Sequence, residues 1–307
     1  MTNRAGRGGG FRHAAWLYRS RAEYLGGVRK FVQAGLACDE PVFLVVPGLE
    51  LLGDWFPRGP SVTVADMREL GGNPARLIPA LRAFADRFPR RRVRYLGEPA
   101  WVDRSGAELL EVARHESLLN LAFADTQISA LCPYNATDLS PAVLADARGV
   151  HPTLRNEHGE RANPDYCGPG GWPDSLAKLL VAPASAEMLV YEGDLRPVRA
   201  LVAAVASQAG LSPARCTDLV IAASEVAANT LRHTTGEGVV RLWETDAEVL
   251  CQIEDRGYIT DPLAGHWRPS DDVPGGQGLW LVNQLCDLAE IRSSELGTTI
   301  RLHMYRR

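Results

Sequence analysis

The chain has 307 residues, of which 46% are hydrophobic and 23% are charged, and its formal net charge is −4. This composition indicates a globular chain of about two domains, and the slightly acidic balance gives no indication of direct nucleic-acid binding. No apolar run reaches the roughly 18 to 20 residues that span a bilayer, and the N-terminus lacks the apolar core of a signal peptide, so we expect a cytoplasmic protein without a membrane partner.

Helical and strand-like segments alternate along the first half of the chain. Residues 1–10 are rich in Gly and Arg, which predicts a disordered start. Alternation of this kind predicts a mainly parallel sheet flanked by helices, an α/β domain over residues 11–166. The expected elements are a helix over 14–36, strands over 41–46, 61–67 and 91–97, and helices over 74–88 and 105–124.

A Gly- and Pro-rich stretch over residues 167–186 separates the two halves and predicts a linker with one short helix over 174–180. The second half, residues 187–307, again mixes strand and helix patterns. Its central helix is expected behind Ser212 and Pro213, an N-cap followed by a first-turn proline. The other expected elements are a strand over 187–193, helices over 195–209 and 218–233, a strand over 249–255 and a helical run over 279–291.

The central helix of the second half places a carboxylate and a carboxamide on one face. Glu225 and Asn229 are four residues apart, so they lie one turn above each other. Asn supplies a neutral oxygen to a hard cation, and Glu can accept a proton. A solvated helix face would have the same pattern, so this pair alone leaves the choice open.

Two later motifs favour a nucleotide site. Asp255 and Gly257 close the strand-like run VLCQIED, and Gly275, Gly276 and Gly278 precede the helical run LWLVNQLCDLAEI. A Gly-rich turn that leads into a helix presents free backbone N–H groups, and the helix dipole favours a phosphate there.

The order of these motifs, with Gly297–Thr299 after them, resembles the ATP-binding fold shared by gyrase, Hsp90, histidine kinases and MutL. The segments ASEVAANTLRHT and GGQGLWLVNQLCDLAEIRSSELGTTIRL are most similar to bacterial anti-sigma-factor serine kinases. The resemblance implies an α+β domain, a two-layer sandwich of a sheet and helices, that binds ATP and Mg²⁺.

The resemblance also implies a role for each motif residue. Asn229 would coordinate Mg²⁺ and Glu225 would accept the proton of the attacking hydroxyl. The remaining residues would bind the nucleotide: Asp255 and Gly257 at the adenine, Gly275, Gly276 and Gly278 over the phosphates, and Thr298 in support of the adenine end.

One position departs from the pattern of the anti-sigma kinases. Many of them carry a basic residue in or beside the Gly-rich loop, where this chain has Gln277. A neutral amide helps a γ-phosphate less than a guanidinium does, so this departure weighs against kinase turnover and not against ATP binding. Arg232, Arg256 and Arg268 are the candidate substitutes.

The first half resembles the MEDS sensory domain in segments such as GEPAWVDRSGAELLEVARHESLLNLAF and HPTLRNEHGERANPDY. The resemblance implies a sensory role for a small ligand and carries no catalytic residues. Ligands of open α/β sheets bind outside the carboxyl ends of strands, where Glu98 and Trp101 are expected. Arg104 and His115 are further candidates, although the helical spacing around His115 equally fits an exposed, salt-bridged face.

The leading hypothesis is a transcription regulator in which the sensory half controls an anti-sigma-type protein serine/threonine kinase. By resemblance, its substrate would be an anti-sigma antagonist of the STAS type and its second partner a sigma factor, and a homodimer stays open. The alternative is a non-catalytic, ATP- or ligand-dependent binding switch. A third hypothesis, a sensor histidine kinase phosphorylated on His115, is weaker because no long helical hairpin follows that residue.

The spacing of the cysteines suggests neither disulfide bonds nor a zinc site. Six cysteines are scattered without a C-x-x-C pair, so the sequence predicts free thiols and indicates neither a zinc site nor disulfides.

Overall fold

The computed structural model describes residues 10–53, 59–171, 179–268 and 277–306. The chain divides into two compact units. The first comprises Met1–Gly71 and Ala80–Leu176, and the second comprises Gly72–Pro79 and Ala177–Arg307. The expected helix over 174–180 falls largely outside the described residues.

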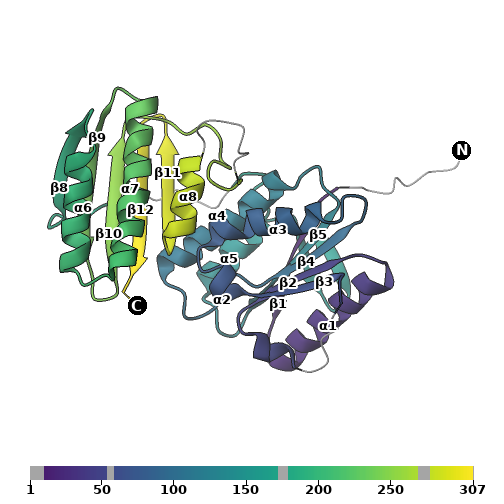
Figure 1. Ribbon diagram of the computed structural model, residues 1–307. Coiled ribbons are helices and arrows are strands. Elements are labelled where there is room, and N and C mark those ends of the chain that lie inside the picture. The colour runs from purple at the N-terminus through teal and green to yellow at the C-terminus, as the bar shows by residue number, and fades with distance from the viewer. Residues whose placement is uncertain (1–9, 54–58, 172–178, 269–276, 307) are drawn as a thin grey trace, which may run out of the picture. The chain divides into compact units, whose positions relative to one another are not determined.

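The first unit contains a mainly parallel sheet, which confirms the predicted fold class of this half (Figure 1). Its strand order is β3-β2-β4-β5-β1-β6-β7, and only β7, at the edge, runs antiparallel to its neighbour. The strands are β1 (Arg12–Tyr18), β2 (Val42–Val46), β3 (Val62–Asp66), β4 (Val93–Gly97), β5 (Ile128–Asn135), β6 (Thr153–Asn156) and β7 (Gly159–Ala162).

Helices cover both faces of this sheet, because the central strands are apolar on both sides. On one face, Trp16 of β1 packs with Val28 and Phe31 of α1. On the other face, Ala15 and Cys132 pack with Val112 of α4. The helical elements are α1 (Arg21–Ala37), η1 (Leu49–Leu52), α2 (Met67–Leu70), α3 (Leu77–Asp86), α4 (Gly106–Ala122) and α5 (Pro141–Val150). The short η2 (Pro74–Arg76), directly before α3, belongs to the second unit.

The prediction of one helix over 14–36 is wrong at its start. Residues 12–18 form β1, the strand between β5 and β6, and α1 begins only after the N-cap Ser20, whose hydroxyl accepts from the backbone N–H of Glu23. A strand that is buried on both faces is apolar throughout, and hydrophobic periodicity alone does not separate it from a buried helix.

Two neighbouring glycines of α1 offer a matched test of packing in the first unit. A Cβ on Gly27 would overlap the indole ring of Trp16, whereas a Cβ on Gly26 would meet no atom within 4 Å. We expect Gly27→Ala to lower the free energy of unfolding by about 1–3 kcal/mol through overpacking. Gly26→Ala should raise it by about 0.5–1 kcal/mol, because alanine favours the helix. Urea denaturation of both variants checks this, and equal effects would contradict it.

The second unit is a two-layer sandwich of an antiparallel sheet and helices, as the predicted fold class requires (Figure 1). Its strand order is β11-β12-β10-β9-β8. The strands are β8 (Glu187–Glu192), β9 (Glu237–Glu244), β10 (Glu248–Asp255), β11 (Leu288–Ser294) and β12 (Gly297–Tyr305).

The helices of the second unit are α6 (Arg196–Gln208), α7 (Pro213–His233) and α8 (Gln277–Leu285), and they pack on one face of this sheet (Figure 1). Every second residue of the strands points into the core between the two layers. Val240 of β9, Cys251 of β10 and Leu302 of β12 meet Val202 of α6 and Ala223 of α7 there.

The predicted helical run over 279–291 is also wrong in its second half. α8 ends at Leu285, and β11 begins at Leu288. Asp287 makes the break because its carboxylate pairs with Arg215 and accepts the backbone N–H of Tyr305 (2.7 Å), which ties the chain to β12. Ala289 and Ile291 then alternate toward the core in the two-residue period of a strand.

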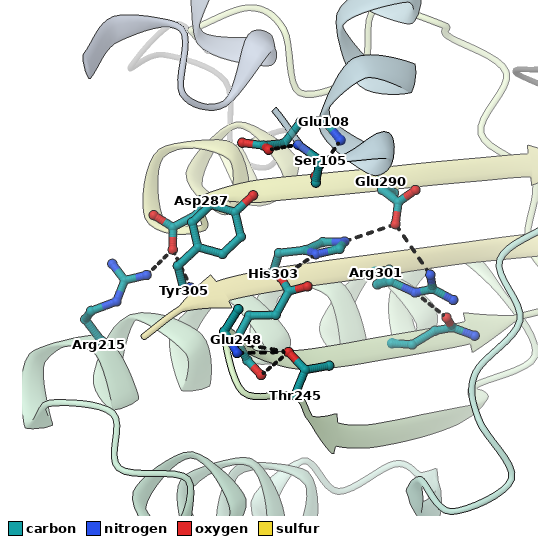
Figure 2. Close-up of polar contacts among 12 residues, drawn as sticks. Ser105, Glu108, Arg215, Thr245, Glu248, Asp287, Glu290, Arg301, His303 and Tyr305 are labelled. Atoms are coloured by element: carbon teal, nitrogen blue, oxygen red, sulfur yellow. Dashed lines mark hydrogen bonds and ion pairs between the residues drawn. The ribbon is translucent and has the colours of Figure 1, made fainter. Parts of the chain in front are cut away.

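The sheet face away from the helices carries a polar network. Figure 2 shows His303 between two carboxylates, with its Nδ1 2.8 Å from Glu248 and its Nε2 3.0 Å from Glu290. Arg301 lies 3.6 Å from the same Glu290 and donates to the side chain of Gln252 (2.9 Å). His303 is only 4% exposed.

This network makes the stability of the second unit depend on pH. Burial of His303 opposes its protonation, but the hydrogen bonds and charges of Glu248 and Glu290 outweigh burial and raise its pKa to about 9. Because the pKa in the folded chain lies above the ordinary value of 6.5, the stabilisation is complete below pH 6.5 and disappears as the pH rises through 9. We expect a loss of about 3 kcal/mol over that interval. In urea denaturation His303→Gln should remove most of this slope, and an unchanged slope would contradict the assignment.

None of the six cysteines is paired in a disulfide in the described residues. Among the helices of the described part of the chain, none combines the length and apolarity needed to cross a bilayer.

Candidate functional site

Helix α7 carries the first two candidate residues. Ser212 caps it by accepting from the backbone N–H of Arg215, and Pro213 occupies its first turn, as predicted. Leu219, Ala223 and Val226 bury one stripe of the helix against the sheet and its neighbours. The stripe that bears Glu225 and Asn229 is left half-buried at the edge of a cavity.

The first turn of α8 lies directly against these two side chains. A Cβ on Gly278 would lie 3.1 Å from Oε2 of Glu225 and 3.4 Å from Nδ2 of Asn229. A Cβ at this position would be in van der Waals contact with Asn229 and would push Glu225 away by a few tenths of an ångström, so glycine gives the closest approach without a shift. The positive end of the α8 dipole is therefore next to Glu225 and Asn229. Gly275 and Gly276, predicted to cover the phosphates, lie outside the described residues.

Asp255, at the end of β10, is held by two hydrogen bonds. Its Oδ1 accepts the backbone N–H of Gly257 (2.7 Å), and its Oδ2 accepts the hydroxyl of Thr230 (2.8 Å). Thr230 in turn accepts from Tyr191 (2.9 Å). Burial raises the pKa of Tyr191 to about 12, so its hydroxyl keeps its proton and donates. Each Asp255 oxygen retains a free lone pair, and the carboxylate cannot rotate away.

Thr298, near the start of β12, holds the turn that follows Asp255. Its hydroxyl donates to the carbonyl oxygen of Gly257 (2.9 Å) and lies 2.6 Å from the hydroxyl of Ser293. Ser293 also accepts the backbone N–H of Ile259 (2.8 Å). The hydroxyl of Thr298 is thus engaged within the protein, and the residue positions the turn.

A cavity of about 740 Å³ joins these groups. This volume is within the range of ligand sites for molecules of nucleotide size. Its polar lining includes Asn229 and Asp255, and apolar side chains complete the walls. The residues that line it are Val226, Asn229, His233, Thr234, Asp255, Gly257, Tyr258, Ile259, Thr260, Asp261, Leu263, Ala264, Gly265, Trp267, Gly278, Leu279, Thr298 and Ile300.

The donor set fits a Mg²⁺ nucleotide. An acceptor that is held rigidly suits the amino group of a base, and Asp255 is such an acceptor. At the other side of the pocket, Asn229 offers a hard oxygen next to the N-terminus of α8, where phosphates are favoured. Glu225 lies beside the first turn of α8 and carries a carboxylate, a group that can accept a proton.

Among the described residues, one of the three arginines that could replace the basic residue of the Gly-rich loop lies close to Glu225. Arg232, two turns further along α7, lies 3.8 Å from the Glu225 carboxylate, while Arg256 and Arg268 are exposed. Gln277, which departs from the anti-sigma kinase pattern, is exposed at the first residue of α8.

In the first unit, two of the four candidate ligand residues line a second cavity of about 300 Å³, namely Glu98 and Trp101. Glu98 follows β4 and accepts the hydroxyl of Tyr18 (2.6 Å). Burial raises the pKa of Glu98 to about 7, and the hydrogen bond from Tyr18 opposes that rise without cancelling it.

The other two candidates do not line this cavity. The buried guanidinium of Arg104 stacks on the ring of Trp101 (3.8 Å) and donates to the carbonyl oxygen of Gly71 (2.5 Å). His115 is 2% exposed, and neither of its ring nitrogens has a hydrogen-bond partner among the described residues. Burial lowers its pKa to about 4.

The interpretation of an exposed, salt-bridged face on α4 is therefore wrong at His115. The expected ion pairs do form, between Arg104 and Glu108 (3.7 Å) and between Arg114 and Glu111 (3.5 Å). However, α4 is buried without interruption from His115 to Asn120, because the helix packs between α5 and the sheet. A phosphoacceptor histidine must be accessible, so the burial of His115 argues against the histidine kinase hypothesis.

Sequence reasoning missed the groups that orient Asp255. Tyr191 and Thr230 lie 64 and 25 residues before it and reach it only through the fold. The one available signal was the position of Thr230 next to Asn229 on a helix that is otherwise apolar at that face.

Two family models match the chain. The MEDS model, described as the methanogen/methylotroph, DcmR sensory domain, matches residues 12–152, and the model of the histidine kinase-like ATPase domain matches residues 191–304. The chain carries an N-terminal MEDS domain and a C-terminal histidine kinase-like ATPase domain.

Among solved structures, the chain matches the crystal structure of the RsbU and RsbW domains of Rv1364c from Mycobacterium tuberculosis. The identity is 23%, the TM-score is 0.31, and the alignment covers 41% of this chain and 34% of that chain. The match spans about a third of that chain, and a TM-score this low does not establish a shared fold. No curated protein matches the chain.

Proposed function

We propose that the second unit binds ATP with Mg²⁺ and transfers its γ-phosphoryl group to a serine or threonine of a STAS-type anti-sigma antagonist. In this proposal the unit also sequesters a sigma factor when the antagonist is phosphorylated. The first unit adjusts this activity in response to a small molecule. The domain boundaries we propose are residues 11–166 for the sensory domain, 167–186 for the linker and 187–307 for the ATPase domain.

The observation that carries the proposal is the approach of Gly278 to Glu225 and Asn229, at 3.1 and 3.4 Å from a Cβ on the glycine. It supports a phosphate position between a cation ligand, a base and a helix N-terminus. Phosphoryl transfer requires mostly positioning and charge neutralisation, so this small set of groups is sufficient.

Each residue has one task in the proposed reaction. Bound Mg²⁺ would supply charge neutralisation at the phosphates, and Asn229 would hold it. Asp255 would accept the adenine amino group, and Thr298 would keep Gly257 in place beside the base. Glu225 would take the proton from the attacking hydroxyl, and the guanidinium of Arg232 is the cation nearest to it.

For the first unit, we propose that the cavity beside Glu98 and Trp101 takes the sensed molecule. Trp101 offers an apolar surface, and Glu98 offers a carboxyl group that burial favours in its neutral form. Because charged side chains such as Arg68 and Asp138 also line the cavity, these groups suit a small polar molecule.

The test is transfer of label from γ-labelled ATP by the full chain to STAS-domain proteins of the same genome. Acid-stable label on a serine or threonine of one of them is the expected result. Partner binding that depends on ATP without any label would favour the non-catalytic switch. Acid-labile label on this chain would instead favour a histidine kinase.

A further inference from the structure

Four metal-binding side chains converge in the core of the first unit. They are His13 of β1, Glu116 of α4, Cys132 of β5 and His151 at the C-cap of α5, and one donor atom of each lies within 4.8 Å of all the others. None of the four is more than 1% exposed.

The fold brings these residues together through strand register and helix packing. β1 and β5 are parallel neighbours, and Cys132 is the partner of Ala15. His13 is two residues before Ala15, so the side chains of His13 and Cys132 lie on the same face of the sheet. α4 covers that face and supplies Glu116, while the end of α5 supplies His151.

The hydrogen bonds of the two imidazoles decide where their protons are. Nδ1 of His13 lies 3.0 Å from Oδ1 of Asn120, whose amide group is oriented by donating to the carbonyl oxygen of Val150 (2.9 Å). Nδ1 of His151 lies 2.7 Å from the carbonyl oxygen of Ala147. Both Nδ1 atoms therefore carry a hydrogen, and in neutral imidazoles both Nε2 atoms present a lone pair.

Both Nε2 lone pairs point at the same carboxylate oxygen. Oε2 of Glu116 lies 2.8 Å from Nε2 of His13 and 3.1 Å from Nε2 of His151. Sγ of Cys132 lies 3.4 Å from Nε2 of His13. The other carboxylate oxygen, Oε1, is buried without a hydrogen-bond partner among the described residues, and Nε2 of His151 makes no aligned hydrogen bond there either. Such a gathering of acceptors requires a cation at its centre.

A divalent ion meets that need better than a proton does. One proton can bridge Glu116 to one histidine only, which leaves the other lone pair facing a carboxylate oxygen. A divalent ion with one carboxylate and one thiolate is neutral, so the set can stay buried. Zn²⁺–N and Zn²⁺–S bonds of about 2.0–2.3 Å place the donors of a tetrahedral site about 3.3–3.8 Å apart, which requires only small shifts of these side chains.

We propose that the sensory unit holds a divalent transition-metal ion of the Zn²⁺ class, ligated by Nε2 of His13, Nε2 of His151, Oε2 of Glu116 and Sγ of Cys132. Nitrogen, oxygen and sulfur donors together suit Zn²⁺, Co²⁺ and Fe²⁺ and do not suit Mg²⁺ or Ca²⁺. Cys132 binds as a thiolate, and its proton passes to solvent.

The outer partners of the two histidines match those of metal sites. A ligating histidine almost always donates its other ring nitrogen to a carbonyl or carboxylate oxygen, which sets the tautomer and the ring orientation. Asn120 and the carbonyl oxygen of Ala147 have this role here. The four ligands come from four separate elements, so their spacing along the chain shows none of the short Cys and His pairs by which zinc sites are found in sequences.

The experiment uses the untagged full chain, produced in minimal medium with Zn²⁺ or with Co²⁺, because buried ligands bind their ion as the unit folds. Elemental analysis should find one ion per chain. The Co²⁺ protein should show the visible bands of a tetrahedral site and a thiolate-to-cobalt charge-transfer band. Cys132→Ser should remove the charge-transfer band, and the control Cys38→Ser, at an exposed thiol of the same unit, should keep it.

A variant outside the ligand set guards against simple unfolding. Asn120→Ala leaves all four ligands in place and should lower Zn²⁺ affinity about 10- to 100-fold, measured by competition with a chelator. Wild-type protein that is folded by circular dichroism but contains no stoichiometric metal, and gives no tetrahedral Co²⁺ spectrum, would overturn the proposal. A charge-transfer band that survives Cys132→Ser would overturn the assignment of the sulfur ligand.

Discussion

Asp255→Asn should lower the affinity for ATP about 10- to 100-fold, although the change is nearly isosteric. The carboxylate accepts from Gly257 and Thr230 and, in the proposed complex, from the adenine amino group. Asparagine replaces one of these acceptors with a donor that faces other donors, which costs about 1.5–3 kcal/mol. Isothermal titration with a non-hydrolysable ATP analogue measures this loss.

The neighbouring Glu254 provides the matched control. It precedes Asp255 on β10, but it points to the opposite face of the sheet, where it pairs with Arg241 (3.1 Å). Glu254→Gln makes the same chemical change one residue away, and ATP affinity should stay within about twofold because surface ion pairs contribute little. Equal losses in both variants would mean that Asp255 does not contact the base.

Glu225→Gln should lower phosphoryl transfer about 10²- to 10⁴-fold, the contribution of a general base, with ATP affinity nearly unchanged. Glutamine keeps the shape of the side chain beside Gly278 but cannot accept the proton of the attacking hydroxyl. Single-turnover phosphorylation of a STAS-domain substrate, together with ATP titration, separates the two effects.

Asp218→Asn is the control for Glu225→Gln, because it removes the same charge two turns earlier on α7, where the side chain does not line the cavity. Its turnover should equal that of the wild type. If Glu225→Gln keeps the full response to its partner, Glu225 is not a base and the non-catalytic switch becomes the better account.

Local patterns predicted the C-terminal unit well where one element carries the whole motif. Ser212 and Pro213 mark the start of α7, and the i, i+4 spacing places Glu225 and Asn229 together, so both follow from sequence. Two hydrogen bonds connect Tyr191 to Thr230 and Thr230 to Asp255, and these residues belong to three different elements. Such contacts depend on strand register and helix packing, which cannot be read from the spacing of residues along the sequence.

Two predictions for the N-terminal unit were wrong, the start of the helix over 14–36 and the exposure of His115. Both failed because sequence spacing does not show how elements pack. Residues 14–18 of β1 are all hydrophobic because helices cover both faces of the sheet, so their pattern equals that of a buried helix. His115 has the spacing of a helix surface, yet α4 is enclosed along its second half. The position of Glu98 and Trp101 beside a cavity could be predicted because the carboxyl end of β4 is a topological position that the order of elements reveals.

The central claim is that the cavity between α7, α8 and β10 is a Mg²⁺-dependent ATP site. Binding of a fluorescent ATP analogue, with and without Mg²⁺, to the wild type and to Asn229→Ala tests it most directly. We predict binding that requires Mg²⁺ in the wild type and is abolished by the substitution. A wild type that unfolds cooperatively but binds no nucleotide, or an Asn229→Ala variant that binds as the wild type does with Mg²⁺, would contradict the claim.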